Sequence, residues 1–419
     1  MITIVNQNQE LTVFVLNNLA IIIMADGGIH MERSIDEINS KIQKGDAIVL
    51  TAEQVIDLVR EKGLDKAVNE VDVVTTGTFG AMCSSGAFLN FGHAEPPIKM
   101  QKVWLNDIPA YAGLAAVDAY IGATEVSDKS GDISYGGAHV IEELVKGRSV
   151  RLHATAYGTD CYPRKEISTN ISLKTINQAY LYNPRNMYQN YAVATNSSEK
   201  TLYTYMGKLL PRNGNATYCS AGQLSPLLKD PQLRTIGIGT RIFLGGGIGY
   251  VSWEGTQYKT NVPMKNDVPA AAARALAVIG DLKQMTPEYI EALYFTKYGT
   301  SLGVGIGVPI PILDKDVLKA AAITDSEIYA QVLDYATQSR ARKPEKLVNY
   351  AELRSGKIEI GGKEVRTSSL SSYHKARAIA NTLKKWIEKG EFLLTEPVEL
   401  MPKEQVQRGL EIRSPEEVI

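Results

Sequence analysis

Cysteine is scarce in this chain, with three residues among 419. Cys83, Cys161 and Cys219 are too few for a disulfide framework and too widely spaced for a zinc motif. Unpaired thiols are typical of a reducing compartment, so we expect a cytoplasmic protein. The five histidines include no pair at metal-ligand spacing, and we therefore expect no bound metal.

An excess of charge of one sign is also missing. The 45 basic and 46 acidic residues give a formal net charge of −1, which argues against nucleic acid or an anionic membrane as the main partner. The apolar stretch from Leu11 to Met24 is too short for a membrane helix. With 44% hydrophobic and 22% charged residues, the chain has the composition of a globular protein.

The order of local patterns predicts a mixed α/β (α+β) fold. A strand at 47–50, a helix that begins at Thr51 and a strand at 71–74 predict a parallel βαβ unit. Alternating residues predict a β-rich middle between 100 and 260. Two later helices are expected, at 269–277 and 287–298. The whole is predicted to be a mixed sheet with flanking helices and a small C-terminal helical appendage.

Three segments follow from these patterns. Residues 1–30 are expected to be an N-terminal extension, the alternative being an added edge strand. Residues 31–338 form the main domain, and 339–419 form an appendage with a hairpin at 357–365. The appendage ends in an amphipathic helix at 371–389. The apolar face of this helix is Ala376, Ile379, Ala380, Leu383 and Ile387.

The most informative motif surrounds Cys83. The apolar run 71–74 leads into a turn with glycines at 77, 80 and 86. Glycines allow positive φ and close backbone approach, and backbone N–H groups that point at a thiol favour the thiolate. A reactive thiol is therefore expected here, the alternative being a small buried hydrophobic residue.

Cys161 also lies in a polar turn, which is fixed by Pro163. The neighbouring Arg164 and Lys165 favour its thiolate, whereas Asp160 opposes it. Cys219 has no cation near it in the sequence. We interpret the Cys219 loop as lining a site and its thiol as incidental.

Two further side chains are candidates for chemistry. His93 follows Cys83 by ten residues, and a Cys–His pair could supply a nucleophile and its base. The alternative is a loop histidine with no role in the reaction. Arg185, in the turn Asn183-Pro184-Arg185-Asn186, is suited to holding a carboxylate.

A glycine-rich loop at 245–249 suggests a dinucleotide site. The helix that a dinucleotide fingerprint requires does not follow, because Val251 to Gly255 is not a helix start. A nicotinamide-dependent oxidoreductase that uses this loop therefore stays an alternative.

Several of these motifs together resemble the homocysteine biosynthesis (sulfur-incorporation) family. The resemblance covers about residues 31–338. The strings that carry it are Thr76-Gly77-Thr78-Phe79-Gly80, Met82-Cys83-Ser84-Ser85-Gly86, Asn90-Phe91-Gly92-His93, Tyr157-Gly158-Thr159-Asp160-Cys161-Tyr162-Pro163-Arg164 and Phe243-Leu244-Gly245-Gly246-Gly247.

The resemblance implies that L-aspartate semialdehyde is converted to L-homocysteine, with sulfide as the sulfur source. It also implies an external two-electron donor, a ferredoxin-like iron–sulfur protein, and no cofactor bound by this chain. Cys83 and Cys161 match the two functional cysteines of the family. One of them would carry a persulfide and attack the aldehyde, and the other would close a disulfide that the partner reduces.

Other residues receive roles in this hypothesis. His93 would move the proton. The residues expected to contact the substrate are Ser84, Ser85, Tyr157, Arg164 and Arg185. A homo-oligomer is compatible with the β-rich middle, and a non-enzymatic binding module for small amino acids is the second alternative.

Overall fold

The structure, a computed structural model, describes residues 33–128, 131–339 and 341–412 in full, together with the backbone of four earlier strands. These strands form an antiparallel sheet of their own in the order β1-β2-β3-β4. Their bounds are Ile2–Asn6, Gln9–Leu16, Leu19–Ile23 and Ile29–Met31. They pair with one another in the described chain, so the segment 1–30 is not an edge strand of the larger sheets.

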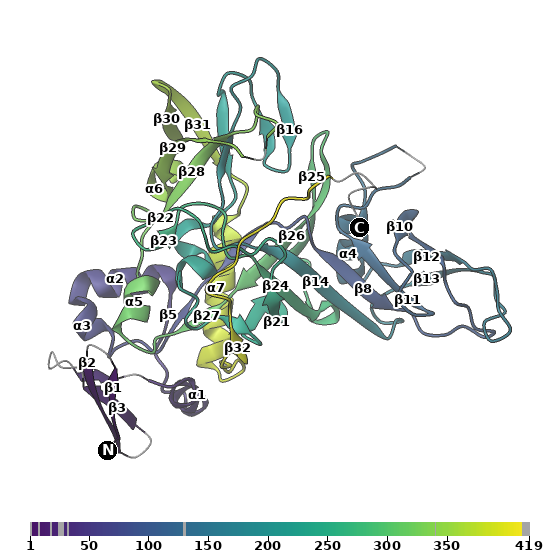
Figure 1. The fold of residues 1–419 in the computed structure, drawn as a ribbon. Coiled ribbons are helices and arrows are strands. Elements are labelled where there is room, and N and C mark those ends of the chain that lie inside the picture. Colours follow the sequence, from purple (N-terminus) through teal and green to yellow (C-terminus); the bar gives the residue numbers. More distant parts are fainter. Residues whose placement is uncertain are drawn as a thin grey trace.

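A nine-stranded antiparallel sheet forms the centre of the molecule (Figure 1). Its order is β11-β8-β14-β24-β21-β20-β26-β25, and β7 also pairs with β26. The bounds are β7 Thr78–Ala81, β8 Gly86–Asn90, β11 Asp118–Gly122, β14 Gln178–Met187, β20 Arg241–Leu244, β21 Gly247–Glu254, β24 Leu276–Asp281, β25 Ile290–Phe295 and β26 Gly299–Gly307. The chain between β7 and β8 must therefore cross from one part of this sheet to another.

The expected parallel βαβ unit is confirmed beside this sheet. Strands β5 (Val49–Thr51) and β6 (Val73–Thr75) pair in parallel, and helix α2 (Ala52–Lys62) connects them. Thr51 caps α2 with its side chain, as a Thr before a helix commonly does. Strand β27 (Pro309–Pro311) completes the sheet, and three more helices flank it. These helices are α1 Ile35–Lys44, α3 Leu64–Ala67 and α5 Lys315–Ala321.

Helix α7 (Tyr373–Glu388) runs through the middle of the molecule, although it lies near the C-terminus (Figure 1). All five residues of its predicted apolar face are buried. The helix packs on β5, β7 and β26, and a Cβ at Gly77 would come within 2.1 Å of the Ala376 carbonyl oxygen. The predicted amphipathic helix is thus confirmed and stands at the core.

A six-stranded mixed sheet lies on one side of α7 (Figure 1). Its order is β29-β28-β15-β18-β31-β30, and it includes the predicted C-terminal hairpin. The bounds are β15 Val193–Thr195, β18 Asn215–Tyr218, β28 Tyr329–Asp334, β29 Pro344–Asn349, β30 Lys357–Ile360 and β31 Lys363–Ser369, with helix α6 at Tyr350–Arg354. The division into a main domain and an appendage stays a prediction, but strands from both segments share this sheet.

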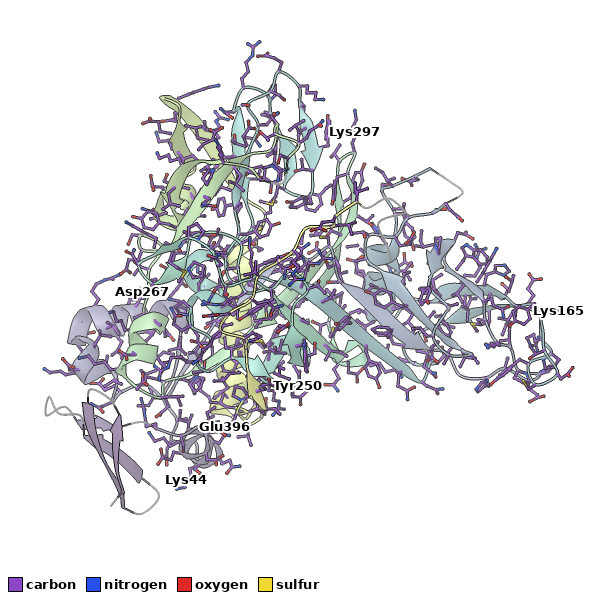
Figure 2. All side chains as sticks on the ribbon, viewed as in Figure 1. Lys44, Lys165, Tyr250, Asp267, Lys297 and Glu396 are labelled. Atoms are coloured by element: carbon purple, nitrogen blue, oxygen red, sulfur yellow. The ribbon has the colours of Figure 1, made fainter. Side chains whose placement is uncertain are left out.

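A four-stranded sheet, which we call the arm, extends from the other side (Figure 1). Its strands are β9 Lys102–Leu105, β10 Ile108–Ala110, β12 Val150–Thr155 and β13 Glu166–Ile171. Helix α4 (Gly137–Val145) packs beside it. Lys165, in the β12–β13 loop, marks the outer end of the arm in Figure 2.

Short elements connect these layers. The two-stranded pairs are β16 Leu202–Thr204 with β17 Gly207–Leu209, β19 Gly237–Ile238 with β32 Glu399–Leu400, and β22 Met264–Lys265 with β23 Val268–Pro269. Single-turn helices are η1 Gly222–Leu224, η2 Pro226–Leu228 and η3 Leu282–Gln284.

The mixed α/β class is confirmed, but two expected helices are wrong. The segment 269–277 is mainly a bend and loop that leads into β24, and the segment 287–298 contains β25. The helix propensity of 287–298 is overridden because β25 pairs with β26 in the nine-stranded sheet. In the part of the chain that the structure describes, no helix has both the length and the hydropathy to cross a membrane.

Candidate functional site

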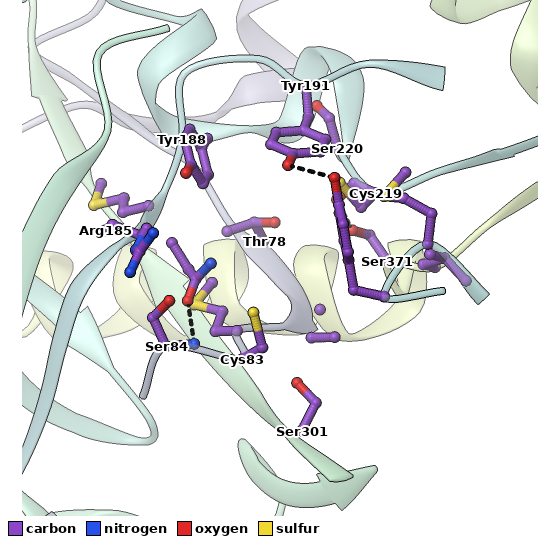
Figure 3. A pocket seen from close by; sticks show the side chains of 18 of the residues that line it. Thr78, Cys83, Ser84, Arg185, Tyr188, Tyr191, Cys219, Ser220, Ser301 and Ser371 are labelled. Carbon is purple, nitrogen blue, oxygen red and sulfur yellow. Dashed lines mark hydrogen bonds between the residues drawn. The ribbon is translucent and has the colours of Figure 1, made fainter. Parts of the chain in front are cut away.

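Two cavities meet at Cys83 beside the nine-stranded sheet, and the inner one extends toward the six-stranded sheet, where Cys219 and Leu370 line it. The inner cavity has a volume of about 260 Å³ and is shown in Figure 3. The outer cavity has a volume of about 650 Å³. Four side chains line both cavities and define their junction: Cys83, Ser84, Arg185 and Tyr298. The predicted reactive thiol is therefore accessible from two sides.

The turn that carries Cys83 is held by three hydrogen bonds. The Ser85 N–H donates to the Met82 carbonyl at 3.0 Å, and the Met82 N–H donates to Leu302 at 2.7 Å. The Ser84 N–H donates to Asn186 Oδ1 at 2.7 Å. Among the described residues, the Cys83 N–H has no hydrogen-bond acceptor. This N–H is therefore free to donate to a bound group.

Arg185 is positioned by a bulge in β14. The fully buried Asn183 accepts the N–H groups of Arg185 and Asn186 at 3.0 and 2.8 Å. Its amide donates to the Ser85 hydroxyl at 2.9 Å, which joins the bulge to the cysteine turn. Arg185 Nε is buried and has no hydrogen-bond partner among the described residues. An unpaired guanidinium at this junction is suited to binding a carboxylate.

The remaining polar lining consists mainly of hydroxyl groups and amides. Arg185 is the sole charged residue among the described residues that line either cavity. Four tyrosines line the inner cavity: Tyr188, Tyr191, Tyr205 and Tyr298. The Ser301 hydroxyl also lines it, buried and without a partner among the described residues. Figure 3 shows Ser301 on the Cys83 side.

Cys219 lines the same inner cavity, opposite Arg185 (Figure 3). Burial, together with a smaller effect of Cys83, raises the pKa of its thiol to about 12. The carbonyl of Cys219 accepts the Ser371 hydroxyl, which fixes the backbone there. The loop lines the inner cavity, and its part in a functional site stays a prediction. Its thiol stays protonated at neutral pH, and the prediction that it is incidental remains a prediction.

Cys161 lies elsewhere, in the turn at the outer end of the arm. It is exposed, and its thiol lies 3.5 Å from the Thr159 hydroxyl. The N–H groups of Thr159 and Tyr162 each donate to the other residue's carbonyl. Cys161 therefore sits in a fixed, solvent-facing turn and lines neither cavity.

Three other predicted residues gather around Cys161. His93 stacks on Tyr162, with ring centroids 6.0 Å apart. Tyr157 is 66% exposed, and its N–H donates to Gln101 Oε1. Arg164 donates to the carbonyl oxygens of Glu95 and Pro96 at 2.6 and 2.8 Å. The Arg164 guanidinium thus joins two loops of the arm tip and is not placed to hold a substrate in either cavity.

The eight predicted site residues therefore form two groups. The cavity group is Cys83, Ser84, Ser85 and Arg185, and the arm-tip group is Cys161, His93, Tyr157 and Arg164. Their roles in a reaction stay predictions, but one described chain does not bring the two thiols into one cavity. In the described ranges, no cluster of three or more His, Cys, Asp or Glu could hold a metal ion.

The glycine-rich loop at 245–249 is a tight hairpin turn between β20 and β21. Gly245 and Gly246 have φ angles of 62° and 100°, which favour glycine. A Cβ at Gly245 would lie 2.8 Å from Met285 Sδ, so the turn is packed against the protein. Strand β21 follows the turn where a dinucleotide site needs a helix. The oxidoreductase alternative therefore loses its structural basis.

Sequence reasoning missed Tyr188, Asn183 and Ser301. The sequence marks Asn183 only as part of the turn around Arg185, and no motif singles out Tyr188 or Ser301. Their convergence depends on pairings between strands far apart in the chain, which no local pattern reveals.

Comparisons with known proteins agree with the motifs. A sequence model of the family described as "Homocysteine biosynthesis enzyme, sulfur-incorporation" matches residues 47–394. An L-aspartate semialdehyde sulfurtransferase of Methanosarcina acetivorans is 54% identical over 374 residues, which cover 89% of this chain and 73% of that protein. Its namesake in Methanocaldococcus jannaschii is 54% identical over 383 residues, covering 88% and 73%. An uncharacterized protein of Methanothermobacter thermautotrophicus is 30% identical over 341 residues, covering 79% and 74%. No solved structure matches the chain.

Proposed function

The chain belongs to the homocysteine biosynthesis enzyme family, and on that premise we propose that it is an L-aspartate semialdehyde sulfurtransferase. It would form L-homocysteine for methionine biosynthesis. The observation that carries the proposal is the Cys83 thiol at the junction of two cavities, beside the unpartnered Arg185. A thiolate can hold sulfane sulfur as a persulfide, and a guanidinium can hold the carboxylate of the amino acid.

The overall reaction fixes what must come from outside the chain. The aldehyde, hydrogen sulfide, two electrons and two protons give the thiol and one water. In this proposal sulfide is the sulfur source, a ferredoxin-like iron–sulfur protein supplies the electrons, and this chain holds no cofactor of its own.

The cavity group supplies the binding and the nucleophile. Arg185 would bind the substrate carboxylate through charge-assisted hydrogen bonds. A persulfide on Cys83 would attack the aldehyde carbon with its terminal sulfur. The Cys83 N–H, which lacks an acceptor in the described chain, would donate to the oxygen that develops negative charge.

The second thiol closes the sulfur cycle. The cycle is entered once, when an external disulfide takes two electrons from the Cys83 and Cys161 thiols and joins them as a disulfide. Sulfide that attacks this disulfide gives a persulfide on Cys83 and a thiol on Cys161. After the persulfide has added to the aldehyde, Cys161 attacks the Cys83 sulfur. This step restores the disulfide and releases a thioaldehyde and water.

The electron balance of this cycle requires that the donor reduces the thioaldehyde, whereas the sequence analysis expects it to reduce the disulfide. Sulfide enters and leaves at the same oxidation level, so the disulfide needs no outside electrons. The two electrons of the donor reduce the thioaldehyde to the thiol. We propose this order in place of reduction of the disulfide.

Cys161 must come from a second copy of the chain in this scheme. It is exposed at the end of the arm, and the outer cavity beside Cys83 is wide. A homo-oligomer in which one arm tip enters the outer cavity of its neighbour would bring the two thiols together.

The proposal is tested by incubating the purified protein with L-aspartate semialdehyde, sulfide and a low-potential reductant. Homocysteine should form. In a separate sample of oxidised protein treated with sulfide alone, intact-mass spectrometry should show one added sulfur that depends on Cys83. The Cys83→Ser variant should lose both signals. Substrate binding without any homocysteine, with all components present, would favour a binding module and reject the proposal.

A further inference from the structure

Ordinary acid–base side chains are missing around Cys83. Among the described residues that line the two cavities there is no His, Asp, Glu or Lys. The proposed attack on an aldehyde converts the carbonyl oxygen into an alkoxide, which needs a proton. His93, the expected proton donor, stacks on Tyr162 at the arm tip. The proton must then come from another kind of group.

Phenols are the acidic hydrogen donors that this cavity offers on the Arg185 side. Tyr191 and Tyr205 are less suitable because they bond to each other at 3.4 Å, and Tyr205 also bonds Tyr335 at 2.9 Å. Tyr298 is 41% exposed in a hairpin turn, so water competes with it. The Cys219 thiol lies across the cavity from Arg185 (Figure 3).

Tyr188 remains, and its position fits the task. It follows the bulge of β14, and its N–H donates to the Asn186 carbonyl at 2.9 Å. Its ring packs edge-on against Tyr191, with centroids 5.1 Å apart. Its hydroxyl donates to Gln257 Oε1 at 3.2 Å, a long bond that a stronger acceptor can replace. Figure 3 shows Tyr188 above both Arg185 and Cys83.

We propose that Tyr188 is the catalytic acid that protonates the substrate's carbonyl oxygen when the Cys83 sulfur attacks. This inference rests on the proposed function and deepens it. Arg185 fixes the carboxylate end of the substrate, and Cys83 faces the aldehyde carbon. With the substrate held in this way, the aldehyde oxygen faces the phenol of Tyr188.

The step balances without an oxidant or a reductant. A C–S bond forms between the terminal sulfur and the aldehyde carbon, and the C=O π bond breaks. The oxygen takes the phenolic proton, which leaves a hydroxyl on carbon and a phenolate on Tyr188. The phenolate recovers a proton from solvent water, and Arg185 stabilises it in the meantime.

The electrostatic surroundings of Tyr188 agree with this role. Burial raises the pKa of Tyr188 to about 12, Arg185 lowers it and Cys83 raises it. A thiolate is too weak a base to remove this proton, whereas an alkoxide is strong enough. The phenol therefore keeps its proton until the aldehyde is attacked.

Tyr188→Phe tests the proposal once the wild-type protein has been shown to load sulfur and to form homocysteine. The variant should still gain one sulfur on Cys83 and keep its KM within about threefold, while kcat falls about 10²-fold or more. A kcat within threefold of wild type overturns the proposal. Failure of the wild type to load sulfur rejects the proposed function instead.

Two further variants separate catalysis from positioning. Gln257→Leu removes the acceptor of the phenol but leaves the phenol in place, so its kcat should exceed that of Tyr188→Phe at least tenfold. Trifluorotyrosine at position 188 has a more acidic phenol, which loses its proton at lower pH. The fall of kcat with rising pH should therefore occur below pH 10. Equal losses in Gln257→Leu and Tyr188→Phe, or an unmoved pH profile, overturn the catalytic role. Tyr180→Phe, which removes an exposed phenol on β14, is the matched control.

Discussion

The cavity at Cys83 and the tip of the arm are opposite environments for a thiol. Cys83 is half-buried among hydroxyls and amides, beside one unpaired guanidinium. Cys161 is exposed beside the stacked His93 and Tyr162 rings, and the nearby Arg164 already donates hydrogen bonds between two loops. In sequence both cysteines lie in polar turns with glycine and look alike.

The two environments favour different reactions of the two thiols. An enclosed thiol with a binding group beside it can hold a substrate in one orientation and exclude competing water. An exposed thiol on a fixed turn can meet a second macromolecule or a second copy of the chain. The proposed function therefore assigns substrate capture to Cys83 and disulfide exchange to Cys161, and both roles are predictions.

Loss of the cavity thiol should have the largest effect. Cys83→Ser is expected to lower homocysteine formation about 10³-fold or more, because a serine hydroxyl cannot hold sulfane sulfur. A discontinuous assay of homocysteine measures the rate, and thermal unfolding checks that the variant is folded. A folded variant with activity within tenfold of wild type would contradict the role of Cys83.

Mixing two dead variants tests whether the arm tip works in a neighbouring copy. Cys161→Ser alone should also be inactive if its thiol is needed for exchange. Coexpression of Cys83→Ser with Cys161→Ser should restore about a quarter of wild-type activity in a symmetric dimer, since half of the dimers are mixed and each has one intact site. No recovery in mixed dimers isolated with two different tags would exclude exchange between copies.

Substitution of the two arginines should have a smaller effect, on KM, and this effect should differ between the cavity and the arm tip. Arg185→Gln is expected to raise KM for the aldehyde about 10- to 100-fold, because a charge-assisted hydrogen bond is lost. Arg164→Gln breaks bonds to Glu95 and Pro96 and should leave KM unchanged. Steady-state kinetics on both variants decides this. A larger KM change in Arg164→Gln would show that the arm tip binds the substrate.

The smallest effect concerns the third thiol and pH. Burial raises the pKa of Cys219 to about 12 in the folded protein, above the usual value of about 8.5 for an unfolded chain. The neutral thiol therefore stabilises the fold fully below pH 8.5, and this contribution is lost as pH rises toward 12. Between pH 8 and 10 the free energy of unfolding should fall by on the order of 1 kcal/mol more in wild type than in Cys219→Ala. Denaturant titrations at the two pH values measure the difference, and equal slopes would contradict it.

Local patterns predicted local features well. The parallel βαβ unit, the face of α7 and the C-terminal hairpin each follow from spacing within one or two elements. The turn at Cys83 was also recognisable, because a strand, glycines and a polar cysteine occur together. These features depend little on the rest of the chain.

The arrangement of the site could not be predicted in the same way. Whether Arg185 or Arg164 faces Cys83 depends on the bulge in β14 and on which strands pair. The helix at 287–298 was wrong for a related reason, since the residues of β25 gain more by pairing with β26 than from their own helix propensity. Nothing in the sequence next to Tyr188 indicates that its side chain lines the inner cavity.

The central position of α7 has a consequence for synthesis of the chain. Thr76, just before β7, bonds to Val308 across 232 residues of sequence, and α7 covers this sheet from nearly the end of the chain. Contacts of such separation form late, because the closing segment must first leave the ribosome. The turn that presents Cys83 is thus assembled only after α7 has left the ribosome, and a chain truncated before α7 would not display an organised Cys83 thiol.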